Sequence, residues 1–432
     1  MDHVIIVGGG VSGLMTAYEL SKHNIHVTVL EAKNRLGGRI HTVRDNLFSQ
    51  PIETGAEFIH GDMPVTLGLL KEAGIKYHVI NDKMFHLEKG KFKKQQDFAE
   101  DWNMLMKQMA TIKEDMPLGD FLRIHFSDDK YAELRESVKG FAGGFDLADI
   151  TTASTKALYR EWSQEMGNQY RIDGGYKRLI DYLEAQCKNR GCSFSTGCCA
   201  KKISWQKNEV NILTMCSRIY KGEKVILTVP VSVLQADTHS ENYIEFEPSI
   251  PEHLHAARNI GFGSVIKIIL EFRESFWKEK KTNPGFIFTK EEVPTWWTQL
   301  PAHNAMLTGW LGSEKANSLK DNSDEEILQI ALQSLSNAFD IPIEGLQLKL
   351  KASKIANWGK EADINGGYSF NTVKTVEAKK ILHRPVSDTI FFAGEALFEG
   401  TPGGTVEAAL SNAKETAQQV LKDLKYGTKF SI

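Results

Sequence analysis

Three glycines near the N-terminus, Gly8, Gly10 and Gly13, have the spacing of a phosphate-binding turn, and they directly follow the apolar run 4–7. In such a turn one glycine permits a sharp bend, one lets the backbone approach a pyrophosphate, and one lets a helix pack close to a strand. The start of that helix presents free N–H groups and a positive dipole end to the phosphates. Glu31 follows Gly10 by about 20 residues, the spacing of a carboxylate that accepts hydrogen bonds from ribose hydroxyls. The pattern predicts a dinucleotide site.

The residues around these glycines predict the elements that hold them in place. A β-branched strand over 4–7, a helix over 11–22 and a second strand over 26–30 form the start of a parallel α/β sheet. The region from 81 to about 165 has mostly helical periodicity. Helices are predicted over 95–112, 118–126, 129–142, 154–165, 176–189, 323–339 and 403–424. Strands are predicted as short runs within 192–229 and over 265–272, 285–289, 305–311 and 390–393.

Two further segments narrow the kind of dinucleotide. Arg35-Leu36-Gly37-Gly38-Arg39 follows Glu31, and Phe391-Phe392-Ala393-Gly394-Glu395 precedes Thr405-Val406-Glu407-Ala408-Ala409 near the C-terminus. A site for NAD needs neither segment. Together with the N-terminal glycines, these segments resemble the flavin-containing amine oxidase family, which includes monoamine oxidases, polyamine oxidases, L-amino-acid oxidases and the flavin histone-lysine demethylases. The resemblance covers nearly the whole chain, because its motifs lie at both ends and in the middle.

The resemblance implies an α/β fold with a discontinuous, Rossmann-like FAD-binding domain and an α+β substrate domain that contains a central mixed sheet. The expected FAD-binding domain takes in residues 1–80, 170–245 and 386–432. The expected substrate domain takes in residues 81–169 and 246–385. The implied cofactor is FAD. Monoamine oxidases carry a cysteine that is joined covalently to the flavin, whereas this chain has Gly367 at that position, so FAD is expected to bind non-covalently.

By the same resemblance, Arg39 is expected to contact the flavin side of the cofactor, and Glu395 its ribityl or pyrophosphate region. Backbone N–H groups around Gly404 and Thr405, at the start of the last helix, are expected to stabilise negative charge on the flavin. The full set of expected cofactor-binding residues is Gly8, Gly10, Val11, Ser12, Gly13, Glu31, Ala32, Arg35, Gly37, Gly38, Arg39, Gly55, Ala56, Glu57, Phe58, Ala200, Trp358, Gly394, Glu395, Gly404, Thr405 and Val406.

Lys267 stands inside the apolar run 265–272. Its type and position alone allow two interpretations: alternate strand residues can face solvent, whereas a buried lysine needs a partner. The string around it resembles the amine-oxidase strand whose lysine bonds through a water to flavin N5. The resemblance therefore implies a catalytic role for Lys267.

Four further residues are expected around the substrate. Tyr368 resembles the family tyrosine that forms one wall of an aromatic cage, where a π-face attracts an amine. Thr405 stands where monoamine oxidases have the second aromatic wall, which favours an aliphatic amine. His60, within 55–61, resembles a histidine that faces the tunnel of animal polyamine oxidases, and Glu57 is a candidate acid in the same pocket. A purely structural role for Tyr368 or His60 stays open. Trp296 and Trp297 are adjacent in a strand, so at most one of them should line the pocket.

The resulting hypothesis is FAD-dependent oxidation of an amine C–N bond to an imine, with O2 as the final acceptor and H2O2 as a product. The expected substrate is an aliphatic diamine, polyamine or monoamine. An L-amino-acid oxidase is an alternative that needs an arginine to clamp the carboxylate; 55–61 contains none, and Arg160 and Arg171 stay open. A desaturase or dehydrogenase that uses a different acceptor is a second alternative, and a non-catalytic chromatin protein is a third.

Composition sets the broader expectations. The 432 residues are 41% hydrophobic and 25% charged, with a net charge of −3, so there is no electrostatic case for nucleic acid as a partner. No apolar run approaches the roughly 20 residues of a membrane span, and no signal peptide is visible. A cytoplasmic enzyme is expected, and a homodimer stays open. The five cysteines lack metal-binding spacing, so no metal site is predicted.

Overall fold

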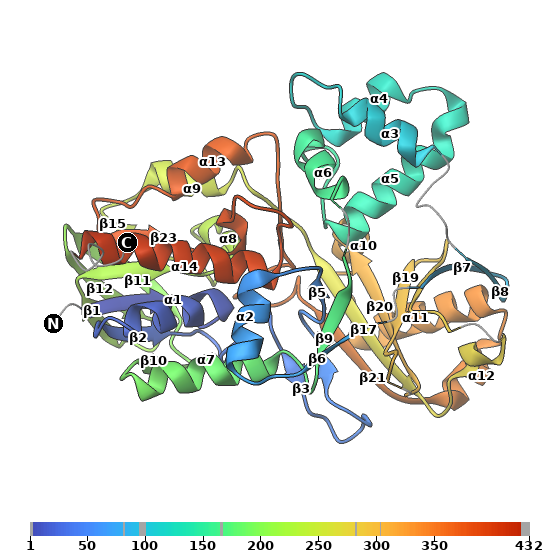
Figure 1. Cartoon of the computed structure of the whole chain (residues 1–432), viewed down its shortest axis with the longest axis horizontal. Coiled ribbons are helices and arrows are strands. Elements are labelled where there is room, and N and C mark those ends of the chain that lie inside the picture. Colours follow the sequence, from blue (N-terminus) through green and yellow to red (C-terminus); the bar gives the residue numbers. More distant parts are fainter. Residues whose placement is uncertain are drawn as a thin grey trace.

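The computed structural model describes residues 3–80, 83–94, 101–164, 167–280, 283–302 and 304–424. Part of the helix predicted over 95–112, and the polar C-terminal residues 425–432, lie outside the described residues. Figure 1 shows a nucleotide lobe that contains the first and last described elements, a second lobe built on a large sheet, and a small helical lobe above that sheet.

The core of the nucleotide lobe is a five-stranded sheet in the order β10-β2-β1-β14-β23, in which every neighbouring pair is parallel. Its strands are β1 (His3–Val7), β2 (His26–Leu30), β10 (Ser193–Ser195), β14 (Lys224–Leu227) and β23 (Ile390–Phe392). One face is covered by α1 (Val11–Ser21), α7 (Lys177–Asn189), α14 (Val406–Asp423) and α2 (Pro64–Glu72). Burial on both faces explains why these strands are continuous apolar runs. The predicted Rossmann-like sheet, assembled from distant segments, is confirmed.

The other face of this sheet packs against a smaller four-stranded sheet and three helices. These elements are β11 (Ala200–Gln206), β12 (Glu209–Thr214), β13 (Ile219–Gly222), β15 (Glu245–Glu247), α8 (Val231–Leu234), α9 (Pro251–Ala257) and α13 (Thr375–Leu382). The expected domain ranges assign α9 and α13 to the substrate domain. In the structure both helices contribute to the apolar core beneath the nucleotide-binding sheet.

The second lobe is built on a seven-stranded sheet in the order β21-β17-β20-β19-β18-β7-β8. It consists of β17 (Val265–Phe272), β18 (Phe286–Phe288), β19 (Thr295–Thr298), β20 (Met306–Gly312), β21 (Leu350–Asn357), β7 (Met84–Glu88) and β8 (Lys91–Lys94). The pair β18–β7 is parallel and the others are antiparallel, so the predicted mixed sheet is confirmed. One face packs with α10 (Ser313–Ser318), α11 (Asp324–Phe339) and α12 (Ile343–Lys349), and η2 (Phe276–Lys280) follows β17.

The hairpin β7–β8 precedes the helices of the region 81–165 and was not predicted from the sequence. Its two-residue turn places Lys89 at φ +46° and Gly90 at φ +68°, which are the positive angles of a type I′ hairpin turn. No strand was predicted here, because Lys91–Lys94 has little apolar alternation and the region that follows has helical periodicity.

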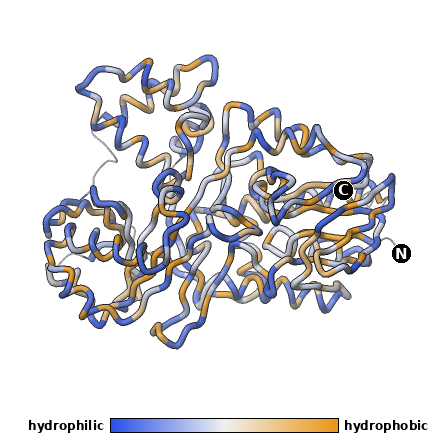
Figure 2. The backbone as a smooth tube through the Cα atoms, turned by 180° about the vertical axis from the view of Figure 1, so that it is seen from behind, coloured by the Kyte–Doolittle hydropathy of each residue, from blue (hydrophilic) through white to orange (hydrophobic). Residues whose placement is uncertain are grey.

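The helical lobe has its own small apolar core. It contains α3 (Trp102–Met109), α4 (Leu118–His125), η1 (Asp129–Tyr131), α5 (Ala132–Phe145) and α6 (Thr155–Trp162). Figure 2 shows polar and apolar residues alternating along these helices, as expected for helices that bury one face.

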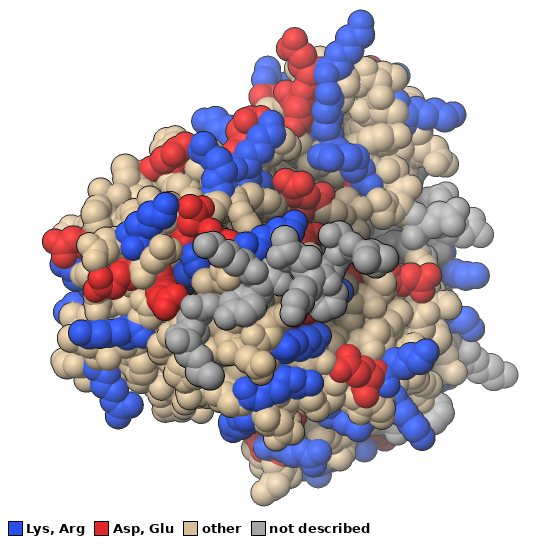
Figure 3. Space-filling model, turned by 60° about the vertical axis from the view of Figure 1, so that its left-hand side comes forward, with Lys and Arg blue, Asp and Glu red and all other residues tan. Residues whose placement is uncertain are grey.

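Short strand pairs connect the lobes around the space between them. They are β3 (Thr42–Val43) with β4 (Ile52–Glu53), β5 (Ile59–His60) with β9 (Gln169–Ile172) and β6 (Tyr77–Val79), and β16 (Gly261–Phe262) with β22 (Ser369–Phe370); η3 (Glu395–Leu397) follows β23. On the face shown in Figure 3, acidic and basic side chains are interspersed and neither sign dominates. Within the described residues, no helix has both the length and the apolar character needed to cross a bilayer.

Candidate active site

A single continuous cavity of about 1880 Å³ runs from the turn between β1 and α1 to the seven-stranded sheet and the helical lobe. Pockets for small ligands usually measure about 300–1,000 Å³. This cavity therefore has room for a dinucleotide and for a separate substrate. The elements that line it come from all three lobes.

The β1–α1 turn fits a pyrophosphate. A Cβ atom on Gly13 would lie 1.9 Å from the carbonyl oxygen of Gly8, so this glycine is needed for the helix to pack on the strand. A Cβ on Gly10 would meet only the Cα of Gly38, at 3.9 Å, and would project into the open cradle. Ser12 lines the same cradle, and its buried Oγ has no hydrogen-bond partner among the described residues. A phosphate oxygen would satisfy this hydroxyl.

Glu31 lines the cavity at the end of β2, where its carboxylate also holds the turn in shape. Its Oε2 accepts from the N–H of Gly9 at 2.7 Å, and its Oε1 accepts from the N–H of Lys33 at 2.9 Å. Burial raises the pKa of Glu31, and these two N–H donors partly offset the effect.

The structure brings together nearly all of the predicted cofactor-binding residues. Every one of them lines the cavity except Gly13 and Arg35. Gly13 lies beneath the turn, and Arg35 donates to the carbonyl oxygens of Leu36, Gly38 and Ile40, which shapes the loop that follows Glu31. Their contacts with a cofactor stay predictions. The segment 228–230, directly after β14, also lines the cavity.

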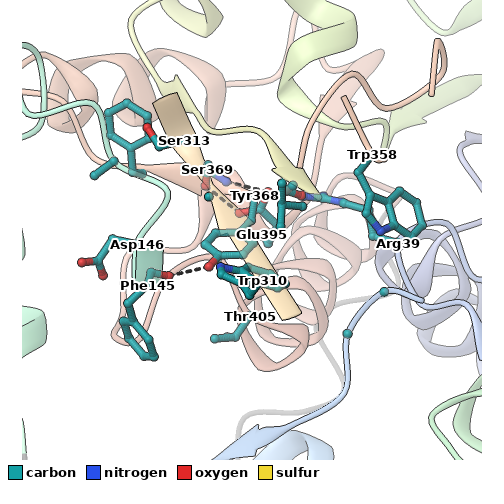
Figure 4. Close-up of a pocket in the computed structure, with 18 of the residues that line it drawn as sticks. Arg39, Phe145, Asp146, Trp310, Ser313, Trp358, Tyr368, Ser369, Glu395 and Thr405 are labelled. Atoms are coloured by element: carbon teal, nitrogen blue, oxygen red, sulfur yellow. Dashed lines mark hydrogen bonds and ion pairs between the residues drawn. The ribbon is translucent and has the colours of Figure 1, made fainter. Parts of the chain in front are cut away.

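Arg39 and Glu395 form an ion pair at the middle of the cavity. Arg39 Nη1 lies 2.7 Å from Glu395 Oε1 and donates to the carbonyl oxygen of Gly367 at 2.9 Å. Ser369 Oγ donates to Glu395 Oε2 at 2.6 Å. Figure 4 shows these side chains meeting beside Tyr368, with Trp358 next to Arg39. This ion pair joins two residues that are 356 positions apart in the sequence and fixes their side chains relative to each other.

Lys267 faces the interior, which decides between the two interpretations of its strand. Every residue of β17 is buried, and the side chain of Lys267 is 1% exposed. Its Nζ donates to Glu57 Oε2 at 2.6 Å and to the carbonyl oxygen of Gly55 at 3.1 Å. Burial on its own would raise the pKa of Glu57, but the charges of Lys267 and Arg171 lower it to about 2. Glu57 is therefore a carboxylate at any working pH.

Aromatic side chains surround the cavity near Lys267. Trp297 lines the cavity, whereas Trp296 packs in the core behind the sheet, so the predicted alternation is confirmed. The rings of Trp297 and Trp310 are 5.9 Å apart, and those of Trp297 and Phe58 are 5.4 Å apart. Tyr368 donates its hydroxyl to the carbonyl oxygen of Phe145, as Figure 4 shows.

Thr405 lines the cavity below Tyr368 and also caps the last helix. Its Oγ1 accepts from the N–H of Ala408 at 3.1 Å. Gly404 has φ +64°, and a Cβ on it would lie 2.7 Å from the ring of Tyr368. The helix start, the glycine and the tyrosine therefore form one packed unit at the cavity wall.

His60 lines the cavity opposite Phe145, with the two rings 6.0 Å apart. Burial lowers its pKa to about 4, although a hydrogen bond with Gln169 opposes the shift. The ring Nδ1 is buried and has no hydrogen-bond partner among the described residues. The low pKa leaves the His60 ring neutral at about pH 7.

Several acids of the helical lobe also line the cavity, and two of them with a raised pKa, Asp146 and Glu161, were missed by reasoning from the sequence. Asp146 Oδ2 accepts from Trp162 Nε1 at 2.9 Å, and Glu161 Oε1 accepts from the N–H of Gly403 at 3.2 Å. Burial, together with the neighbouring charge of Glu161, raises the pKa of Asp146. Burial raises the pKa of Glu161 to about 7. Figure 4 shows Asp146 beside Phe145, on the Tyr368 side of the cavity.

The arginines bear on the amino-acid-oxidase alternative. Among the described residues that line the cavity, Arg39 is the sole arginine, and it is paired with Glu395. Arg171 lies behind the wall, bonded to Glu57, and Arg160 is exposed outside the cavity. In the described part of the chain, no arginine of this cavity is left to clamp a carboxylate.

Comparison with known proteins agrees with this geometry. The family model described as flavin containing amine oxidoreductase matches residues 11–421. Polyamine oxidase 2 of Arabidopsis thaliana is 26% identical over 98% of this chain and 89% of its own length. The mouse (Mus musculus) lysine-specific histone demethylase 1B is 26% identical over 96% of this chain. The chain spans about half the length of that demethylase, 52%.

Solved structures share the fold. Wild-type putrescine oxidase bound to putrescine superposes with a TM-score of 0.80 at 20% identity, covering 98% of this chain and 99% of that one. Cyclohexylamine oxidase from Brevibacterium oxydans IH-35A gives a TM-score of 0.79 at 17% identity, with the same coverage. These likenesses confirm the predicted fold class. The flavin of the matching family, together with the dinucleotide cradle at β1–α1, confirms the predicted cofactor, FAD. The chain belongs to the family of flavin-containing amine oxidoreductases.

Proposed function

We propose that this protein oxidises the C–N bond of an aliphatic diamine or polyamine to an imine, with non-covalently bound FAD and with O2 as the final acceptor. One observation carries the proposal. A single cavity joins the dinucleotide cradle to an aromatic chamber that contains a buried lysine and two acids. The imine then hydrolyses, and O2 leaves as H2O2.

When bound, FAD supplies the redox chemistry: it takes two electrons from the amine carbon and passes them to O2. The residues of the chain hold and orient the reactants. Gly8, Gly10 and Ser12 would hold the pyrophosphate and Glu31 the ribose, since they line the cradle end of the cavity. Arg39 with Glu395 would hold the cofactor at the centre. Lys267 contributes a fixed positive charge at the wall of the reaction chamber.

The chamber fits an alkyl amine with a second, charged nitrogen. Trp297, Trp310 and Tyr368 offer π-faces to the reacting amine. Asp146 and Glu161 lie on the helical side of the same chamber and would attract a distal ammonium group. Thr405 leaves space where a second aromatic wall would favour a flat substrate. The polyamine oxidases that match over most of their length point to the same substrate class.

The alternative of an L-amino acid is disfavoured by the charges of the chamber. Among the described residues, an α-carboxylate would find no free arginine, because Arg39 and Arg171 are already bonded to Glu395 and Glu57. A substrate carboxylate would have to break one of these pairs and leave a buried glutamate, Glu395 or Glu57, without its arginine.

Oxygen uptake together with H2O2 release tests the reaction itself. Purified protein that contains FAD should consume O2 and release an equal amount of H2O2 when putrescine or spermidine is added, and neither change should occur without an amine. Turnover with a quinone or another artificial acceptor, with no uptake of O2, would instead favour a dehydrogenase.

A further inference from the structure

We infer that Glu57 is the positioning residue of the reaction chamber: its carboxylate holds the Lys267 ammonium at the cavity wall and binds donors of the protein rather than the substrate. This inference rests on the proposed function, in which Lys267 works beside the cofactor. It assigns to Glu57 a different task from the substrate-binding acid that the sequence predicts.

The position of Lys267 depends on Glu57. β17 is buried on both faces, and an unpaired lysine there would carry a large desolvation cost. An ammonium group has three N–H bonds. Two of them reach Glu57 Oε2, at 2.6 Å, and the carbonyl oxygen of Gly55, at 3.1 Å. The third remains for a group in the cavity that Lys267 lines.

Both oxygens of the Glu57 carboxylate accept hydrogen bonds from the protein. Its Oε1 is 2.9 Å from Arg171 Nε and 2.8 Å from Arg171 Nη2, and it also accepts from Trp297 Nε1 at 3.1 Å and Gln299 Nε2 at 3.3 Å. With Lys267 on Oε2, both oxygens of this buried carboxylate already accept hydrogen bonds from the protein. A substrate ammonium would have to compete with these donors for Glu57.

Arg171 fixes the orientation of that carboxylate. Its Nη2 and Nη1 also donate to the carbonyl oxygens of Thr298, at 3.0 Å, and Leu300, at 3.3 Å. Its guanidinium group lies 4.7 Å from the ring centre of Phe58. Because Arg171 extends from β9 to carbonyl groups at the end of β19, the orientation of the Glu57 carboxylate depends on how these two strands are placed. Two cations and one carboxylate leave one excess positive charge, and of the two cations only Lys267 lines the cavity.

The test is a double-mutant cycle of E57Q and K267M, with putrescine as substrate. Glutamine keeps the size of the side chain but loses the charge that holds Lys267. We expect E57Q to lower kcat roughly tenfold to a hundredfold with KM within about twofold, as for loss of a positioned polar group. In the K267M background the same substitution should change kcat by less than about twofold, because the residue that Glu57 positions is already absent.

Glu271 provides the matched control. It lies on the same strand, is 4% exposed, and accepts from the N–H of Ser49 at 2.7 Å and from Lys351 Nζ at 2.8 Å, away from the cavity. E271Q should lower the thermal midpoint of the protein by several degrees and leave kcat unchanged. If E57Q slows turnover equally in both backgrounds, Glu57 acts on the fold or on the substrate, and the inference is wrong.

A second readout does not depend on turnover. In a crystal structure of E57Q, Lys267 Nζ should have left hydrogen-bond distance of Gly55, whereas in E271Q it should stay there. An unmoved Lys267 in E57Q overturns the inference.

If the wild-type protein oxidises no amine, the proposed function fails, and the position of Lys267 in E57Q still decides the role of Glu57. If E57Q does not fold, E57D retains the charge but retracts it, and the same cycle applies.

Discussion

Lys267 shows why one side chain can be predicted as important while its environment stays open. Strand alternation places Lys267 on the opposite face of the sheet from Ile266 and Ile268. It does not predict whether other parts of the protein bury the face that carries Lys267. In the structure the same face also carries Val265 and Ile269, which pack in two separate apolar clusters. The lysine lies between them, and its charge is compatible with that setting because Glu57 is there to meet it.

Replacing Lys267 by methionine should leave FAD bound and slow turnover. The substitution keeps an unbranched chain of similar length, so β17 should pack as before, while the fixed charge at the chamber wall is lost. We expect kcat to fall roughly tenfold to a thousandfold. Steady-state rates and the flavin content of the purified variant measure the two effects separately.

Lys351 is the control for this substitution. It pairs with Glu271 at 2.8 Å, its side chain is 40% exposed, and it lies outside the cavity. K351M should therefore turn over at the wild-type rate. Equal rates for K267M and the wild type would mean that the buried charge has no part in the reaction.

The acids of the helical lobe give a prediction about pH. Burial raises the pKa of Glu161 to about 7, so the carboxyl is protonated below this pH and ionised above it. A distal ammonium stays protonated across this range, so its attraction to Glu161 should grow as the pH rises. The ratio of kcat/KM for putrescine to kcat/KM for pentylamine should increase between about pH 6 and about pH 8 and then level off.

The ratio cancels the ionisation of the reacting amine, which the two substrates share. In E161Q it should be lower at high pH and should not change with pH. A ratio that is constant with pH in the wild-type protein would show that the distal ammonium does not interact with this acid pair.

At the scale of elements, two glycines of the turn between β1 and α1 have different roles: Gly10 leaves space for a ligand, and Gly13 lets the helix pack on the strand. Gly10→Ala adds a methyl group with no protein atom closer than 3.9 Å, whereas Gly13→Ala drives one to 1.9 Å from a carbonyl oxygen. The first variant should keep the stability of the apoprotein and lose FAD, because the methyl group occupies the cradle. The second should also lose stability, by about 1–3 kcal/mol or more, because the helix must shift.

Denaturant unfolding of the apoproteins, together with the ratio of flavin to protein after purification, distinguishes these outcomes. If Gly10→Ala binds FAD as tightly as the wild type does, the pyrophosphate does not lie in this cradle.

The elements that the sequence predicted well are those whose pattern is local. β17, α11 and α14 each begin and end within about three residues of their predicted limits, because apolar periodicity and end residues determine them. The β7–β8 hairpin was not predicted, since its strands are stabilised by pairing with β18, which lies about 200 residues further along. Pairing of that kind leaves little trace in the segment itself.

The same distinction holds for the site. The glycines, Glu31 and Lys267 could be singled out from their own neighbours in the sequence. Asp146 and Glu161 could not, because on amphipathic helices they look like ordinary surface acids, and only the packing of the helical lobe over the cavity buries them. The contact between Glu57 and Lys267 spans 210 residues and depends on the assembled lobes.

At the scale of the whole molecule, the cavity exists because the chain passes repeatedly between its lobes. The cradle comes from the N-terminal residues, Lys267 from the central sheet, and Thr405 from the start of the last helix.

Residue 367, before Tyr368, is a glycine whose Cβ would meet Leu147 and Val265 at 2.5 and 2.9 Å, so no side chain there can reach a cofactor. FAD should therefore pass through a filter when the protein is denatured; yellow colour that stays with the polypeptide would indicate a covalent link.

The proposed function requires that the chamber bind an amine with a second positive charge. A comparison of putrescine, pentylamine and L-ornithine as substrates is the most direct test of this requirement. Pentylamine lacks the distal ammonium of putrescine, and L-ornithine adds a carboxylate to it. We predict that kcat/KM is highest for putrescine, at least about tenfold above pentylamine, as one buried charge interaction of about 1.4 kcal/mol requires. L-Ornithine should be the poorest of the three. A higher kcat/KM for L-ornithine than for putrescine would contradict the proposed function.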